Sequence, residues 1–95
     1  MSNINVPNNT ALLNSCKLSI VHDKPIYLNY WTDSQQNEVY IGKNNDGEKM
    51  IVRDEEEYTS PIEKLYKIDN AYVVVTANSI YIVSINIQVK QVNLN

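Results

Sequence analysis

The sequence is poor in the residues that most enzymes and metal sites use. It has one cysteine, Cys16, one histidine, His22, and two glycines among 95 residues. A single cysteine excludes an intrachain disulfide, and one cysteine with one histidine is too few ligands for a zinc site. Two isolated glycines cannot form the glycine-rich loop that cradles phosphate groups. We therefore expect no metal, no cofactor and no phosphate-binding loop.

No arrangement of residues predicts catalysis. In an extended strand Cys16 and His22 would lie roughly 20 Å apart, which is too far for direct proton transfer between them. No carboxylate is flanked by the apolar residues that would adapt it to act as a general acid. The acidic run at residues 54–57 and the loop at 44–48 do not have the spacing of a calcium-binding loop. We therefore expect a non-enzymatic protein without catalytic residues.

Positive charge is also scarce. The chain has eight Lys and Arg against eleven Asp and Glu, its formal net charge is −3, and Arg53 is its one arginine. Nucleic-acid binding needs a basic surface that displaces counterions from phosphates, so we expect no nucleic-acid partner. No apolar run approaches the ~20 residues that span a membrane, so we expect no membrane contact. These features predict a cytoplasmic protein, in the host cytoplasm if it is viral.

The apolar residues that are present favour β-structure. Phe is absent, Ile and Val dominate, and there are seven Tyr. Such side chains suit a pleated, half-buried sheet, and many of them alternate with polar residues. Residues 32–37 read as a polar loop, a helical turn is predicted near Thr10, and residues 62–68 fit two helical turns almost as well as a strand. The predicted strands are 16–22, 26–31, 38–43, 49–53, 62–68, 71–76 and 79–92.

Turn signals define several connections. Asn44 to Gly47 is the strongest, because Asn, Asp and Gly tolerate positive φ, and it predicts a hairpin over residues 38–53. Residues 54–57 read as a solvated loop or the acidic first turn of a short helix. Ala77 and Asn78 read as a hairpin loop in which Asn78 adopts the left-handed conformation. The strand 79–92 is apolar on one face throughout and on the other only in its first half, which predicts a strand that is central at its start and edge-like at its end.

Together these elements predict one all-β domain over residues 10–95, preceded by a flexible polar arm at residues 1–9. The expected fold is a six- or seven-stranded antiparallel meander, curved into a bent sheet or a partly open barrel. At most one short helix is expected, near Thr10 or Ile62.

Tyrosines, Trp31 and a group of hydroxyls are the candidate binding residues. Tyr and Trp combine a large apolar area with a polar tip, which concentrates them at recognition surfaces. Tyr27 and Trp31 share one face of the predicted strand 26–31. The hydroxyls of segments 59–60 and 76–79 either make hydrogen bonds within turns or converge on a ligand. The predicted partner- or ligand-binding residues are Trp31, Tyr58, Thr59, Ser60, Asn78, Ser79 and Tyr81.

Two short segments carry a resemblance. They are Glu57-Tyr58-Thr59-Ser60-Pro61-Ile62 and Thr76-Ala77-Asn78-Ser79-Ile80-Tyr81, within the stretch from Glu57 to Val83. This pairing resembles small bacteriophage proteins in which a Thr-Ser-Pro-Ile/Val segment precedes a short hairpin with a Thr-x-Asn/Ser-Ser-x-Tyr motif. The resemblance implies an accessory protein of a phage or other mobile element. Proteins of that kind often bind and block a host or defence protein, or sequester a small nucleotide signal.

Three functional hypotheses follow. The first is an inhibitor that binds a host or defence protein, indicated by the acidic charge, the many tyrosines and the lack of a catalytic set. The second is a binder of a small nucleotide signal, with its pocket at a homo-oligomer interface. The third is a structural virion subunit that assembles as a homo-oligomer through the edge of the 79–92 strand.

Overall fold

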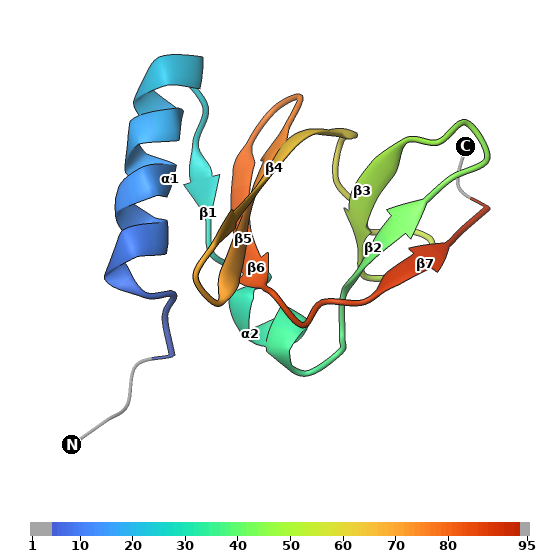
Figure 1. Ribbon diagram of the computed structural model, residues 1–95. Helices are drawn as coiled ribbons and strands as arrows, with labels where there is room; N and C mark the ends of the chain where they lie inside the picture. The colour runs from blue at the N-terminus through green and yellow to red at the C-terminus, as the bar shows by residue number, and fades with distance from the viewer. Residues whose placement is uncertain (1–4, 94–95) are drawn as a thin grey trace.

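The chain forms two β-sheets and a helix that covers one of them (Figure 1). The computed structural model describes residues 5–93. One sheet has the strand order β1-β6-β5-β4, and the other has the order β3-β2-β7. The helices are α1 (Asn9–His22) and α2 (Trp31–Gln35). The strands are β1 (Ile26–Tyr27), β2 (Tyr40–Lys43), β3 (Lys49–Val52), β4 (Ile62–Ile68), β5 (Ala71–Thr76), β6 (Ile80–Ser84) and β7 (Val89–Gln91).

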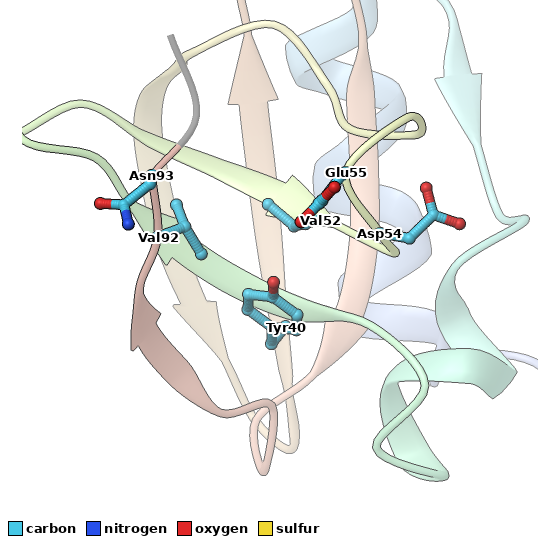
Figure 2. A pocket seen from close by; sticks show the side chains of 6 residues that line it. All are labelled: Tyr40, Val52, Asp54, Glu55, Val92 and Asn93. Atoms are coloured by element: carbon cyan, nitrogen blue, oxygen red, sulfur yellow. The ribbon is translucent and has the colours of Figure 1, made fainter.

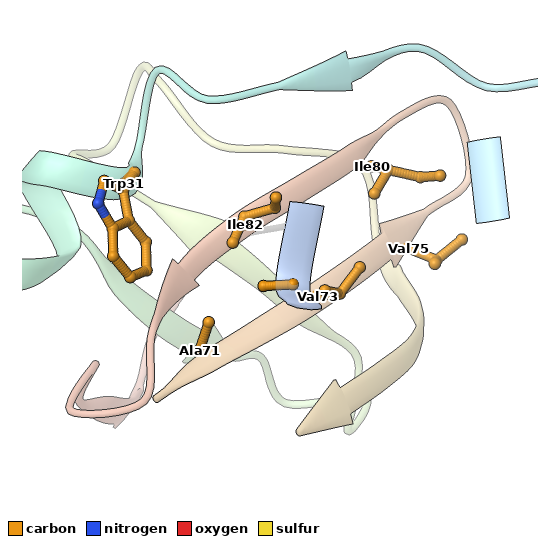
Figure 3. Close-up of a cluster of buried hydrophobic side chains, with 7 residues drawn as sticks. Trp31, Ala71, Val73, Val75, Ile80 and Ile82 are labelled. Atoms are coloured by element: carbon orange, nitrogen blue, oxygen red, sulfur yellow. The ribbon is translucent and has the colours of Figure 1, made fainter. Parts of the chain in front are cut away.

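The four-stranded sheet lies between α1 and the three-stranded sheet, so its central strands are buried on both faces (Figure 1). Alternate residues of β5 and β6 enter two separate apolar clusters. The helix-side cluster contains Ala11, Trp31, Ala71, Val73, Val75, Ile80 and Ile82 (Figure 3). The cluster between the sheets contains Tyr30, Val39, Ile41, Ile51, Val74, Val83 and Ile87. Burial on both faces explains why β5 is an almost unbroken apolar run.

The prediction of a strand at residues 16–22 is wrong, because these residues belong to α1. Asn8 caps the helix, and its side chain accepts a hydrogen bond of 2.8 Å from the backbone N–H of Ala11. Ala11 and Ser15, one helical turn apart, are fully buried against the sheet. The outward-facing Ile20 is 82% exposed. Because apolar residues also lie on the exposed side of this helix, apolar and polar residues alternate along its sequence as they would in a strand. The buried residues, in contrast, recur at the helical spacing.

The end of α1 provides a test of this assignment. Asp23 adopts the left-handed conformation (φ 53°, ψ 50°), and its N–H bonds to the Ser19 carbonyl. Glycine enters this conformation without steric cost, so Asp23→Gly is expected to raise the free energy of unfolding by about 0.5–1 kcal/mol. Asp23→Val is expected to lower it by about 1–2 kcal/mol. Urea denaturation of both variants measures this, and equal destabilisation by both would contradict the helix end.

A purely antiparallel meander is also wrong, although the protein is mainly β as predicted. β1 pairs in parallel with β6, with Ile26 opposite Ile80. β2 pairs in parallel with β7, with Ile41 opposite Val89. The described residues form two separate mixed sheets instead of a single bent sheet or barrel. A sheet with apolar residues on both faces needs a second layer on each side, and α1 and the second sheet supply them.

The predicted strand over residues 79–92 is two strands in different sheets. β6 ends at Ser84, whose carbonyl and hydroxyl accept hydrogen bonds from the N–H groups of Ile87 and Asn86, at 3.1 and 3.2 Å. The chain then crosses to the other sheet, where β7 lies at an edge beside β2. Ile87 keeps the apolar alternation because it is buried between the sheets. The alternation of apolar residues therefore continues from β6 to β7 although the strand itself ends at Ser84.

The predicted strand 26–31 is shorter than expected. Only residues 26–27 form β1, and Trp31 begins α2, which also occupies most of the predicted loop 32–37. Asn5 of the predicted arm accepts a hydrogen bond from the Trp31 indole N–H at 3.1 Å. Pro7 is fully buried, so the arm's described part lies against the domain, while residues 1–4 are outside the described range.

Several local predictions are confirmed, and two open alternatives are decided. β2 and β3 form the expected hairpin, and Gly47 in its turn has φ 84°. Residues 54–57 form a loop, and residues 62–68 form a strand instead of helical turns. The expectation for Asn78 is wrong, because the left-handed residue of the β4–β5–β6 region is Asp69, with φ 53°. In the described chain, no helix is long and apolar enough to cross a membrane.

Candidate functional site

An open groove lies where β1, the β5–β6 turn and the segment before β4 meet. Its volume is about 420 Å³. We call it the tyrosine groove, because three of its lining residues are tyrosines. The groove is lined by Tyr27, Asn29, Tyr58, Thr59, Ser60, Thr76, Asn78, Ser79 and Tyr81. All predicted binding residues except Trp31 are among them.

Parallel pairing of β1 with β6 places two of the rings together. Tyr27 lies opposite Tyr81 in the register, and their ring centroids are 5.8 Å apart with an interplanar angle of 34°. Tyr30 continues the row on the inner side, with its ring 5.5 Å from that of Tyr81. Its hydroxyl donates a hydrogen bond of 2.8 Å to Glu57. The row thus has a buried, anchored inner end at Tyr30 and an outer end at Tyr27, which is 47% exposed.

The hydroxyls divide into two groups. Thr76 accepts hydrogen bonds from the backbone N–H groups of Asn78 and Ser79 and donates one to the Ser79 carbonyl. Thr59 accepts one from the Ile51 N–H at 3.0 Å. Thr76 therefore holds the β5–β6 turn together, as one of the two alternatives expected, while Thr59 ties the segment before β4 to β3. Ser60 accepts a hydrogen bond of 2.6 Å from the Asn78 side chain, so these side chains join the segment before β4 to the β5–β6 turn.

The lining is uncharged, although charges lie nearby. None of the nine lining residues is Lys, Arg, Asp or Glu. The Lys24 ammonium is already engaged, by the carbonyl of the lining residue Thr76 at 2.7 Å and by Glu63 at 2.9 Å. Next to the groove, Glu57 pairs with Arg53 at 3.2 Å, and Arg53 also pairs with Asp33. The groove therefore offers aromatic faces, hydroxyls and amides without a formal charge.

Comparison with models of known protein families, with curated proteins and with solved structures finds no match for this chain. The resemblance of residues 57–83 to bacteriophage accessory proteins stays a prediction. Functional inference therefore depends on the geometry of the site.

The structure corrects the prediction for Trp31. Its side chain is 3% exposed and belongs to the helix-side cluster, so it does not line the groove (Figure 3). The predicted strand 26–31 would have placed Tyr27 and Trp31 on one face, but α2 begins at Trp31 and turns its ring inward. Tyr27, Asn29 and Thr76 line the groove without having been among the predicted residues. The sequence places Tyr27 on a predicted apolar strand, but it does not indicate that this strand pairs with β6.

A smaller pocket of about 180 Å³ lies on the three-stranded sheet (Figure 2). The Lys90 ammonium lies 4.8 Å from the centroid of the Tyr40 ring at this place. None of the predicted binding residues lines this pocket, which is formed by Tyr40, Val52, Asp54, Glu55, Val92 and Asn93. Over residues 5–93, no group of three or more His, Cys, Asp or Glu residues is placed to hold a metal ion.

The buried end of the tyrosine row predicts a pH dependence of stability. Burial raises the pKa of Tyr30 well above its usual range, and the hydrogen bond to Glu57 acts in the same direction. Burial also raises the pKa of Tyr81. The folded state is therefore more stable while both phenols are neutral than after they lose their protons. Their contribution is complete below the ordinary tyrosine pKa of about 10 and is lost as the pH rises above it.

We expect the urea midpoint to fall steadily between pH 9.5 and 11.5. Tyr30→Phe removes one raised pKa and is expected to make this decline shallower, by at most about 1.4 kcal/mol per pH unit. Tyr58→Phe, at a ring that is 41% exposed, is the matched control. An unchanged slope in Tyr30→Phe would contradict the burial of a protonated phenol.

Proposed function

We propose that this protein is a non-enzymatic binding protein whose tyrosine groove receives a segment of a partner protein. In this proposal the partner is a host or defence protein that is blocked by a phage or mobile-element accessory protein. The observation that carries the proposal is the convergence of three tyrosines, two asparagines and several hydroxyls on one open groove. Rings of this type supply large contact areas at protein interfaces with little loss of side-chain entropy.

Exposure of the rings supports a partner. Tyr27 is 47% exposed and Tyr58 is 41% exposed, and both rings line the groove. A segment that enters the groove would cover apolar area of both rings and form hydrogen bonds with the hydroxyls at the same time. The row of rings behind Tyr27 is fixed by the Tyr30–Glu57 hydrogen bond. A rigid, pre-formed surface of this kind loses little entropy on binding.

The two alternative functions have less support. A nucleotide signal carries phosphates, which are usually bound by Arg, Lys or a cradle of backbone N–H groups. No charged residue lines the groove, and Lys24 is engaged with Thr76 and Glu63. The virion-subunit hypothesis relied on one continuous edge over residues 79–92, which the structure divides between two sheets.

The test is whether partner capture depends on the groove. The baits are the unchanged protein, the double variant Tyr27→Ala/Tyr58→Ala, and Leu65→Ala, which removes a side chain of similar exposure (43%) from β4. We expect one protein from lysate of the producing cell to be retained by the unchanged bait and by Leu65→Ala, and lost by at least tenfold from the double variant. Thermal denaturation checks that all baits are folded.

Two outcomes would contradict the proposal. One is the same set of captured proteins for all three baits. The other is a thermal stabilisation by nucleotides that the double variant abolishes, which would favour the nucleotide hypothesis.

A further inference from the structure

We propose that Arg53 is a positioning residue of the tyrosine groove, which it supports through Glu57 and Tyr30 without lining the groove itself. This inference rests on the proposed function and deepens it, because it names a residue that controls the shape and the binding strength of the same surface. Arg53 directly follows β3 and is the one arginine of the chain. It is not among the residues that line the groove.

The guanidinium group of Arg53 joins three parts of the fold. Its Nε donates a hydrogen bond of 3.2 Å to Glu57 of the following loop, and a terminal nitrogen pairs with Asp33 of α2. Its central carbon lies 5.8 Å from the centroid of the Tyr30 ring. A planar guanidinium binds two carboxylates and an aromatic face at the same time, whereas the ammonium of lysine is a single point charge. These contacts therefore use the shape of the arginine side chain as well as its charge.

One carboxylate oxygen links Arg53 to the tyrosine row. Oε2 of Glu57 accepts the hydrogen bond from Arg53 and also the hydrogen bond of 2.8 Å from the Tyr30 hydroxyl. The ring of Tyr30 lies 5.5 Å from that of Tyr81, which lies 5.8 Å from that of Tyr27. Tyr27 and Tyr81 line the groove. Tyr30 does not, so a change at Arg53 reaches the lining through the Tyr30 ring.

The Glu57 carboxylate needs the guanidinium to stay in place. Its side chain is 52% exposed, so without the ion pair it gains rotamer freedom by turning into the solvent. The backbone of Glu57 is held separately, because its carbonyl accepts from the Arg53 N–H at 2.9 Å and its N–H donates to Asp54 at 2.8 Å. An ion pair this exposed contributes little to stability. Removal of the Arg53 side chain therefore releases the carboxylate while the loop keeps its backbone bonds.

Release of the carboxylate leaves Tyr30 without its acceptor. Burial raises the pKa of Tyr30, so its phenol stays protonated and is the donor in this hydrogen bond. The residue is 5% exposed, and a buried hydroxyl without an acceptor is unfavourable, so the ring shifts to bring the hydroxyl to water. Tyr81 packs on that ring and moves with it. The groove then loses part of its pre-formed surface, which makes binding more costly in entropy.

The first measurement needs no partner protein. NMR spectra of the protein with labelled tyrosine rings report the ring-current shifts that the neighbouring rings impose on Tyr81. We expect Arg53→Gln and Arg53→Lys to change these shifts, since neither new side chain has the planar fork that holds both carboxylates. Lys90→Gln is the matched control, because it removes the cation–aromatic contact with Tyr40 on the other sheet. It is expected to leave the Tyr81 shifts unchanged, and thermal denaturation checks that all variants are folded.

The second measurement tests whether Arg53 acts through the Tyr30 hydroxyl. We expect Arg53→Gln to weaken capture of the partner protein roughly fivefold. Tyr30→Phe has no hydroxyl that needs an acceptor. In that background, adding Arg53→Gln is therefore expected to change capture by less than about twofold. A residue that only stabilises the fold would weaken capture equally in both backgrounds.

Unchanged Tyr81 shifts in Arg53→Gln would overturn the inference, as would an equal loss of capture with and without the Tyr30 hydroxyl. Full restoration of the shifts in Arg53→Lys would show that charge alone is sufficient, which also contradicts it. If the shifts change as expected but the unchanged protein captures nothing, the contacts from Arg53 to Tyr81 stand and the proposed function fails. Capture that is lost in Tyr27→Ala/Tyr58→Ala and unchanged in Arg53→Gln refutes the positioning role and leaves the proposed function.

Discussion

Trp31→Ala is expected to lower the free energy of unfolding by about 3–5 kcal/mol, a large part of the 5–15 kcal/mol typical of small domains. The indole is 3% exposed and packs with Ala11, Ala71 and Ile82 between α1 and the four-stranded sheet. Removing it leaves a cavity that the surrounding strands cannot close, and deletes the hydrogen bond to Asn5. Urea denaturation followed by far-UV circular dichroism measures the loss, since the variant has no tryptophan fluorescence.

Trp31→Phe is the matched control. It keeps an aromatic ring in the cluster but removes the N–H donor, and Asn5 retains its hydrogen bonds to Thr32 and Gln35. We expect a clearly smaller loss than for alanine. A change within about 0.5 kcal/mol in Trp31→Ala would be typical of a surface residue. It would contradict the buried position and restore Trp31 as a binding residue.

Gly42→Ala is expected to destabilise the three-stranded sheet by about 1–3 kcal/mol. Gly42 lies in the central strand β2, opposite Met50 of β3 and Lys90 of β7. A β-carbon there would lie 2.8 Å from a methyl of Val52 and 3.0 Å from a methyl of Val92. These β-branched side chains have little freedom to move aside, so the strands must separate. The decrease in the urea midpoint measures this cost.

A double-mutant cycle identifies the cause. Val52→Ala removes the methyl nearest to the new β-carbon, so Gly42→Ala and Val52→Ala combined are expected to cost at least 0.5 kcal/mol less than the sum of the single changes. Gly47→Ala is the control. No atom lies within 4 Å of a β-carbon at Gly47, so this substitution destabilises the protein only through the backbone conformation of φ 84°. It is expected to be additive with Val52→Ala. Additivity of the Gly42 pair would contradict the steric explanation.

The parts of the fold that were predictable depend on short-range chemistry. The 38–53 hairpin and the β4–β5–β6 meander join neighbours in sequence through Asn-, Asp- and Gly-containing turns. Alternating burial then selects the strand register. The segment 62–68 was ambiguous because seven residues of IEKLYKI satisfy both periods. Pairing with β5 resolves it, since Tyr66 and Ile68 pack on the helix-side cluster.

The parts that were not predictable depend on contacts between distant segments. The α1 sequence has apolar residues on both its buried and its exposed sides, so its periodicity does not identify a helix. Its capping residues Asn8 and Asp23 are also common turn residues. β1 and β7 are only two and three residues long. Their parallel partners are far away in the sequence, and no local pattern indicates such pairing.

The candidate site shows the same division. Residues 58–60 and Asn78, Ser79 and Tyr81 were predicted from their hydroxyls, tyrosines and turn residues, and the β4–β5–β6 hairpins bring them together. Tyr27 reaches the groove only through the parallel pairing of β1 with β6. Trp31 leaves it because α2 begins at that residue.

The sequence by itself determined that this protein is mainly β and that it has one cysteine and one histidine, and it predicts that binding uses tyrosines, hydroxyls and amides. These properties follow from composition and from hydrogen bonds between near neighbours. The tertiary structure decided that the domain has two mixed sheets with α1 over one of them, and that β1, the β5–β6 turn and the segment before β4 meet to form the tyrosine groove. The physical reason is that β5 and β6 are apolar on both faces. Removing both faces from water requires a layer on each side, and the chain supplies those layers from segments whose own sequences do not specify where they pack.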